Sequence, residues 1–174
     1  PENMGQVEQY AIDQYLMRGG SVIIALSNYK LNIDPISSYL ALTPIENGLA
    51  AMLESYGILT SAEVVMDLQN APFPVLVNRT LGATQVQEVQ ARPYPFFVDI
   101  RQDGMDTENM IVSDLAAVSM NWASPVTLDE EKNQNRNTSV LLSSSPNSWR
   151  SSSTNIQPNY ELYPETGFEP AAEF

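Results

Sequence analysis

The stretch "YAIDQYLMRGGSVIIALSN", residues 10–28, decides the fold, because it joins a helical pattern to an apolar extended run through two glycines. Apolar residues at three- and four-residue spacing predict one face of a helix, and they are Val7, Tyr10, Ala11, Leu16 and Met17. Gly19 or Gly20 would then adopt the left-handed conformation that ends a helix. Residues 21–26, "SVIIAL", are apolar on both faces, which is typical of a buried parallel strand.

The two glycines also raise the possibility of a phosphate-binding loop. Such a loop follows a strand and opens a helix, so that the helix N-terminus points at the anion. Here the helix comes before the glycines, and neither GxxxxGK[ST] nor GxGxxG occurs in the chain. We therefore interpret Gly19-Gly20 as a helix stop and expect no nucleotide binding.

Composition excludes several classes of function. The chain has 174 residues, enough for one domain with a core, and 21 acidic against 8 basic residues give a net charge of -13. This charge argues against nucleic acid or anionic lipid as a partner. Cysteine and histidine are absent, which excludes thiol nucleophiles, Ser-His pairs and typical zinc sites. We expect no cofactor, no metal and no catalysis.

The first third of the chain predicts an alternation of helices and strands. After the first helix and strand come a polar loop at residues 27–44, a helix at 45–56 that Gly57 ends, and a short strand at 63–67. This order predicts an α/β fold with a mostly parallel sheet flanked by helices.

The rest of the chain has a different pattern. Residues 85–97 predict an antiparallel strand insertion in the middle of the fold, and Pro93 and Pro95 argue against a central strand there. Further strands are expected near residues 118–122 and 139–142. We assign residues 1–150 to one α/β domain and 151–174 to an extended tail of the same domain, truncated before a further strand.

Four apolar runs, "VIIAL", "VVM", "SMNW" and "VLL", are each followed by small polar residues. This pattern suggests a ligand-binding edge of the predicted sheet. If the strands are parallel, their carboxyl ends share one edge of the sheet, where open α/β sheets bind ligands. The predicted edge residues are Ser27, Asn28, Asp67, Ser124 and Ser144, with Trp122 or Trp149 close by. The alternative is that these residues only form the turns in which strands end.

Acidic and aromatic residues offer weaker candidates. Asp103, Asp106 and Glu108 suggest a calcium loop or a carboxylate pair, but their spacing does not match an EF-hand, and we interpret them as solvated surface. Trp122 and Trp149 would suit a sugar or peptide surface if exposed. Alternatively, both tryptophans pack under the tail and hold it to the sheet.

Six segments in this order carry a family resemblance: "YAIDQYLMRGGSVIIAL", "GLAAMLESYGI", "VVMDLQN", "SMNWASPV", "LLSSSPNSW" and "YELYPETGF". The chain resembles the extracytoplasmic auxiliary component of ABC-type transport systems, of the gliding-motility-associated type. The resemblance implies a glutamine-amidotransferase-like or intraflagellar-transport-protein-like fold, with one strand before the first helix and another after "YPETGF" missing from this chain.

The resemblance also implies partners and a location. The partners would be the ABC permease and ATPase subunits of the same system, on the periplasmic or extracellular face, with membrane anchors only outside this segment. We therefore expect a non-catalytic interaction or ligand-binding domain of an ABC-type transport or gliding-motility-associated complex. The alternatives are an independent carbohydrate- or peptide-recognition domain and a cryptic hydrolase.

Overall fold

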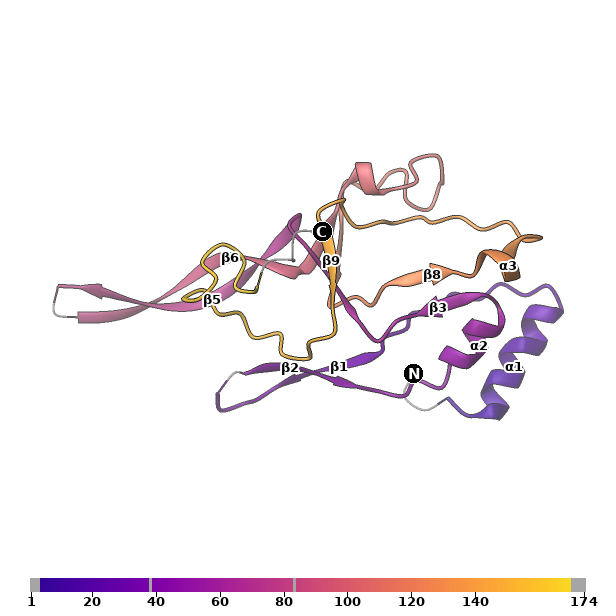
Figure 1. The fold of residues 1–174 in the computed structure, drawn as a ribbon, viewed down its shortest axis with the longest axis horizontal. Helices are drawn as coiled ribbons and strands as arrows, with labels where there is room; N and C mark the ends of the chain where they lie inside the picture. Colours follow the sequence, from indigo (N-terminus) through magenta and orange to yellow (C-terminus); the bar gives the residue numbers. More distant parts are fainter. Residues whose placement is uncertain (1–3, 38, 83, 170–174) are drawn as a thin grey trace. The chain divides into compact units, whose positions relative to one another are not determined.

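A computed structural model describes residues 4–37, 39–82 and 84–169 (Figure 1). These residues form two compact units. Unit 1 comprises the residues up to Val64, together with Ser124–Ser139 and Ser152–Asn155. Unit 2 comprises Val65–Ala123, Val140–Ser151 and the described residues from Ile156 onward. Residues 170–174 of the expected tail lie outside the described residues. The assignment of residues 1–150 to one domain with a tail stays a prediction.

Unit 1 contains three helices and two antiparallel strand pairs among its described residues. Its helices are α1 (Gln6–Met17), α2 (Ala50–Ser55) and α3 (Glu130–Asn133). Its strand pairs are β1 (Tyr29–Ile33) with β2 (Leu40–Pro44), and β3 (Ile58–Thr60) with β8 (Val126–Leu128). The core cluster of Leu49, Met52 and Leu53 is contacted by partly buried side chains, which are Met4, Ile12, Leu26, Tyr56 and Ile58.

The end of α1 confirms the predicted helix stop. Gly19 has φ +86°, which is the left-handed region that favours glycine. The Gly19 amide donates to the Leu16 carbonyl at 2.9 Å, and the Gly20 amide donates to the Tyr15 carbonyl at 3.0 Å. These two bonds form a Schellman motif, which satisfies carbonyls that the last helical turn leaves unpaired.

Unit 2 is built on one long hairpin. β5 (Asn70–Leu81) pairs antiparallel with β6 (Thr84–Ile100), and β7 (Val118–Asn121) pairs antiparallel with the last four residues of β6. The short helix η1 (Gln102–Gly104) follows β6, and β4 (Val64–Asp67) pairs with β9 (Ser148–Ser151). One core cluster contains Val98, Ile100, Met105 and Val112.

The predicted mostly parallel sheet flanked by helices is wrong. The pairs β1–β2, β3–β8, β5–β6 and β6–β7 are all antiparallel, and each sheet among the described residues has two or three strands. The main cause lies in residues 21–26, which form no strand, so that the helix–strand unit of a parallel sheet is missing. The antiparallel pairing expected in the middle of the chain is confirmed by β5 and β6.

Several predicted elements differ from those observed. Residues 27–44, interpreted as a loop, form the β1–β2 hairpin, and the helix expected at 45–56 is limited to α2 and its caps. Residues 139–142 contribute only an isolated bridge between Leu142 and Met105, while β9 is formed further along the chain. Pro93 and Pro95 do not end β6. Pro93 is opposite Pro72 of β5, and Pro95 lies where the register of the two strands shifts, between Asn70 and Pro72 of β5.

Candidate functional site

The predicted edge residues are divided between the two units. Ser27, Asn28 and Ser124 belong to unit 1, whereas unit 2 contains the other four residues, which are Asp67, Trp122, Ser144 and Trp149. The common edge rested on parallel strands, and that premise is wrong. An edge that joins the two groups of residues stays a prediction.

In unit 1, Ser27 and Asn28 make internal hydrogen bonds. The Ser27 hydroxyl lies 2.7 Å from the Tyr29 carbonyl and 3.1 Å from the Tyr29 amide. Asn28 Nδ2 donates to the Ser61 carbonyl at 2.8 Å, and Asn28 Oδ1 accepts from Asn47 Nδ2 at 3.1 Å. Asn47 is buried, and its Oδ1 accepts from two amides that begin α2. These contacts support the alternative in which Ser27 and Asn28 form a turn.

In unit 2, Asp67 joins β4 to the loop of residues 143–146. Its carboxylate is fully buried. Oδ2 accepts from the Ser145 amide at 2.7 Å, and Oδ1 accepts from the Ser145 hydroxyl at 2.6 Å and from the Gln69 amide at 2.9 Å. Both carboxylate oxygens therefore have donors, as a buried carboxylate requires.

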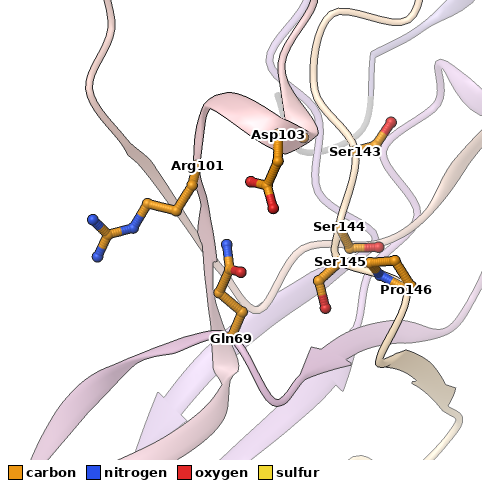
Figure 2. Close-up of a pocket in the computed structure, with 8 residues that line it drawn as sticks. Gln69, Arg101, Asp103, Ser143, Ser144, Ser145 and Pro146 are labelled. Atoms are coloured by element: carbon orange, nitrogen blue, oxygen red, sulfur yellow. The ribbon is translucent and has the colours of Figure 1, made fainter.

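A small polar pocket lies beside this contact (Figure 2). Its volume is about 30 Å³, and the residues that line it are Gln69, Arg101, Asp103, Gly104, Ser143, Ser144, Ser145 and Pro146. Figure 2 shows Asp103 directed toward the space below η1 and the Arg101 guanidinium directed away from it. Arg101 Nε instead donates to Asp99 at 2.8 Å. The pocket has room for a water molecule or a small ion, and it is too small for an organic substrate.

Trp122 belongs to an aromatic cluster that holds the C-terminal segment. Its indole Nε1 donates to the Tyr94 hydroxyl at 3.1 Å, and that hydroxyl donates to the Ile156 carbonyl at 2.8 Å. The Tyr94 ring also contacts Phe168, with 5.5 Å between ring centroids. Burial raises the pKa of Tyr94 far above its usual value. Trp122 has φ +50°, which is uncommon for a bulky residue. These contacts favour the packing role for Trp122.

The other predicted residues have structural surroundings. The Ser144 hydroxyl is hydrogen-bonded to the Ser148 hydroxyl at 2.8 Å, and Trp149 lies half-buried in β9. The buried Ser124 hydroxyl has no hydrogen-bond partner among the described residues. Tyr160 of the tail donates its hydroxyl to the Pro93 carbonyl at 2.8 Å.

Two further observations concern metals and membranes. Within the described ranges, no three histidine, cysteine, aspartate or glutamate residues are grouped so as to hold a metal ion. In the same part of the chain, no helix is long and apolar enough to cross a membrane. The acidic residues expected to form solvated surface include Asp103 and Glu108, which are exposed.

Sequence reasoning missed two exposed surfaces. Residues 21–25 are exposed, with Ile23 at 99%, and no hydrogen bond joins the backbone of residues 21–26 to another described residue. The distal part of the β5–β6 hairpin exposes Leu76 and Val89, at 67% and 64%. The apolar composition of "SVIIAL" was visible in the sequence, but it indicated burial because β-branched runs are normally buried.

Comparison with known proteins gives one match. A family model described as "ABC-type uncharacterized transport system" matches residues 1–172. No curated protein and no solved structure matches the chain.

Proposed function

The chain belongs to the family of ABC-type uncharacterized transport systems, in which it is an auxiliary component, and from this premise we propose that it is a non-catalytic interaction domain of its transporter. It would face the periplasm or the cell exterior and contact the permease of the same system. The observation that carries this proposal is the run of residues 21–26, of which residues 21–25 are exposed and Leu26 contacts the core cluster of unit 1.

The run has the properties of a strand without a sheet. Ile23 is 99% exposed, and its neighbours Val22 and Ile24 are each 36% exposed. Its backbone makes no hydrogen bond to any other residue in the part of the chain that the structure describes. Exposed apolar strands invite pairing with another chain, and proteins normally cover them or interrupt them with charge or proline. The run contains no charged residue and no proline.

Strand addition fits these properties. In this mode an extended segment completes the edge of another protein's sheet, with backbone hydrogen bonds for affinity and side chains for specificity. Because the run is apolar on both faces, the partner has to supply a covering layer as well as a sheet edge. Residues 14–33 contain two basic residues, Arg18 and Lys30, and no acidic residue. This charge favours a partner strand with acidic residues at its ends.

The test uses the full-length protein produced together with the ABC permease and ATPase of its own system. The unsubstituted protein should copurify with the permease, and Ile23→Lys should reduce the copurified permease several-fold. Ile36→Lys is the matched control, because Ile36 is 95% exposed in the same unit and the substitution is identical. Both variants should retain the thermal stability of the original protein, since both side chains lie in solvent.

A second variant tests the backbone. Ile24→Pro removes an amide donor from the run, so it should weaken copurification if the run pairs as a strand. Absence of the permease from preparations of the unsubstituted protein would overturn the proposed function. Equal retention of the permease by Ile23→Lys and Ile36→Lys would overturn the role of the run.

A further inference from the structure

We propose that the distal part of the β5–β6 hairpin is a self-association surface, on which β5 of one copy pairs antiparallel with β5 of a second copy. We call this part the arm, and it comprises residues 75–81 of β5 and 84–91 of β6. The result would be a four-stranded sheet in the order β6–β5–β5–β6.

The arm is a two-stranded ribbon without support from a third strand. Its register runs from Val75 opposite Gln90 to Leu81 opposite Thr84, whereas β7 pairs with β6 only at Phe97–Ile100. Figure 1 shows β5 and β6 as a long two-stranded ribbon. Among the described residues, no hydrogen bond, ion pair or ring contact joins the arm to residues outside β5 and β6. Two-stranded ribbons are at best marginally stable alone, and a third strand or more is normally required.

The arm also exposes one apolar cross-strand pair and a further leucine. Leu76 and Val89 are directly opposite each other in the register, and both are more than 60% exposed. Leu81 near the tip is 55% exposed. Wider sheets reduce such exposure, because neighbouring strands cover the flanks of each side chain.

Both outer edges of the arm are open among the described residues, but β5 has no acidic residue, whereas the β6 part of the arm contains Glu88. Pro72 and Pro74 lack backbone donors, so they prevent pairing at the base of β5 and limit it to residues 75–81. The base of β6 is contacted by the C-terminal segment. There, Tyr160 binds the Pro93 carbonyl, and the Arg92 guanidinium lies 5.4 Å from the centroid of the Tyr160 ring.

Charge favours a second copy at this edge. Two copies with a net charge of -13 each repel one another over most of their surfaces. β5 is the longest described strand without an acidic residue, and Arg79 is its only charged residue. Two copies can therefore approach along β5 without bringing carboxylates together.

One register brings opposite charges together. With the two-fold axis at Asn78, Arg79 of one copy would lie opposite Val77 of the second copy. Within each copy, Val77 is opposite Glu88 of β6. Within one copy, Arg79 Nη1 lies 3.4 Å from Glu88 Oε2. Each Arg79 would then lie near the Glu88 carboxylates of both copies. Opposite charges on one face of a sheet stabilise such pairs, whereas like charges destabilise them.

The absence of cysteine permits a direct test of this register. In purified Asn78→Cys, the two thiols would face each other across the axis, with Cα atoms roughly 4.5–5.5 Å apart, a separation that suits a disulfide. Mild oxidation should convert most of this variant to a covalent dimer. Gln87→Cys is the matched control, because Gln87 is exposed and directly opposite Asn78 on β6. Its thiols would be about 14 Å apart, at roughly 4.8 Å per strand, and should not form a disulfide.

Sedimentation equilibrium of the purified chain provides the second measurement. The unsubstituted chain should have twice the monomer mass, R79E should shift it toward monomer, and R79E/E88R should restore the dimer by exchanging the charges. A monomeric unsubstituted chain, or equal disulfide formation by Asn78→Cys and Gln87→Cys, would overturn the proposal. Both experiments use this chain alone, so their failure is distinguishable from failure to bind the permease.

Discussion

The Asp67 carboxylate binds both the amide and the hydroxyl of Ser145, at 2.7 and 2.6 Å, across 78 positions of the sequence. This contact holds the loop of residues 143–146 against the end of β4. Because Asp67 is fully buried, its hydrogen bonds replace those that water would supply. The residue predicted as part of a binding edge therefore has a structural role.

We predict that Asp67→Ala destabilises the protein by about 1–3 kcal/mol, because it leaves two partly buried donors of Ser145 without their acceptor. The free energy of unfolding in urea measures this change. Asp103→Ala is the control, since Asp103 lines the same pocket but is exposed, and it should alter stability by less than about 0.5 kcal/mol. Equal effects of the two substitutions would contradict the structural role of Asp67.

The glycines after α1 give a second prediction. Gly19→Val should destabilise the protein by about 1 kcal/mol or more, because a β-branched residue disfavours positive φ. A steric clash is not the cause, since apart from Gly19 and its two chain neighbours no heavy atom lies within 4 Å of the position that a Cβ would occupy. Gly19→Asn should destabilise the protein less than Gly19→Val, because asparagine tolerates the left-handed conformation. Thermal unfolding of both variants measures the difference, and equal losses would show that the conformation of Gly19 is not the cause.

Local signals in the sequence predicted local structure correctly. The first helix and its Gly19-Gly20 stop are confirmed by α1, and part of the second helix is confirmed by α2. The predicted apolar face of α1 is wrong, because Val7, Tyr10 and Met17 are exposed. Ile12 contacts the core cluster instead. Such features depend on residues within a few positions of each other. The alternation of residues 85–90 likewise predicted an antiparallel partner, because strand periodicity is local.

Long-range pairing could not be predicted in the same way. Residues 21–26 have the composition of a buried strand, but composition does not specify whether a sheet edge is available to them. The parallel sheet was inferred from this run, so the error extended to the fold class and to the premise of the common edge. The Asp67–Ser145 contact was also missed, because no local pattern connects residues that are 78 positions apart.

The third prediction is that the chain has no enzymatic activity. The Ser145 hydroxyl donates to Asp67, but the chain contains no histidine to act as a base. We expect the purified chain to show no glutaminase, amidase or glycosidase turnover above buffer, measured by release of ammonia or reducing sugar. Turnover that disappears in Ser145→Ala, with the fold retained by circular dichroism, would overturn the non-catalytic assignment.

The last prediction concerns alkaline pH and Tyr94. Burial raises the pKa of Tyr94 in the folded protein above the value of 10.0 that applies in the unfolded chain. The folded state therefore binds this proton more tightly, and its contribution to stability is complete below about pH 10. As the pH rises above 10 toward the folded pKa, the unfolded chain loses the proton first, so the free energy of unfolding should fall.

Tyr94→Phe separates this effect from that of the other tyrosines. At neutral pH the variant should be less stable by about 1–3 kcal/mol, because the buried Ile156 carbonyl loses its donor. Above pH 10 its stability should decline less steeply than that of the unsubstituted protein, since the phenol is gone. Trp122→Phe keeps the Tyr94 hydroxyl and should retain the steep decline. Urea unfolding between pH 8 and about pH 11 compares the three slopes, and an unchanged slope in Tyr94→Phe would show that Tyr94 does not control alkaline stability.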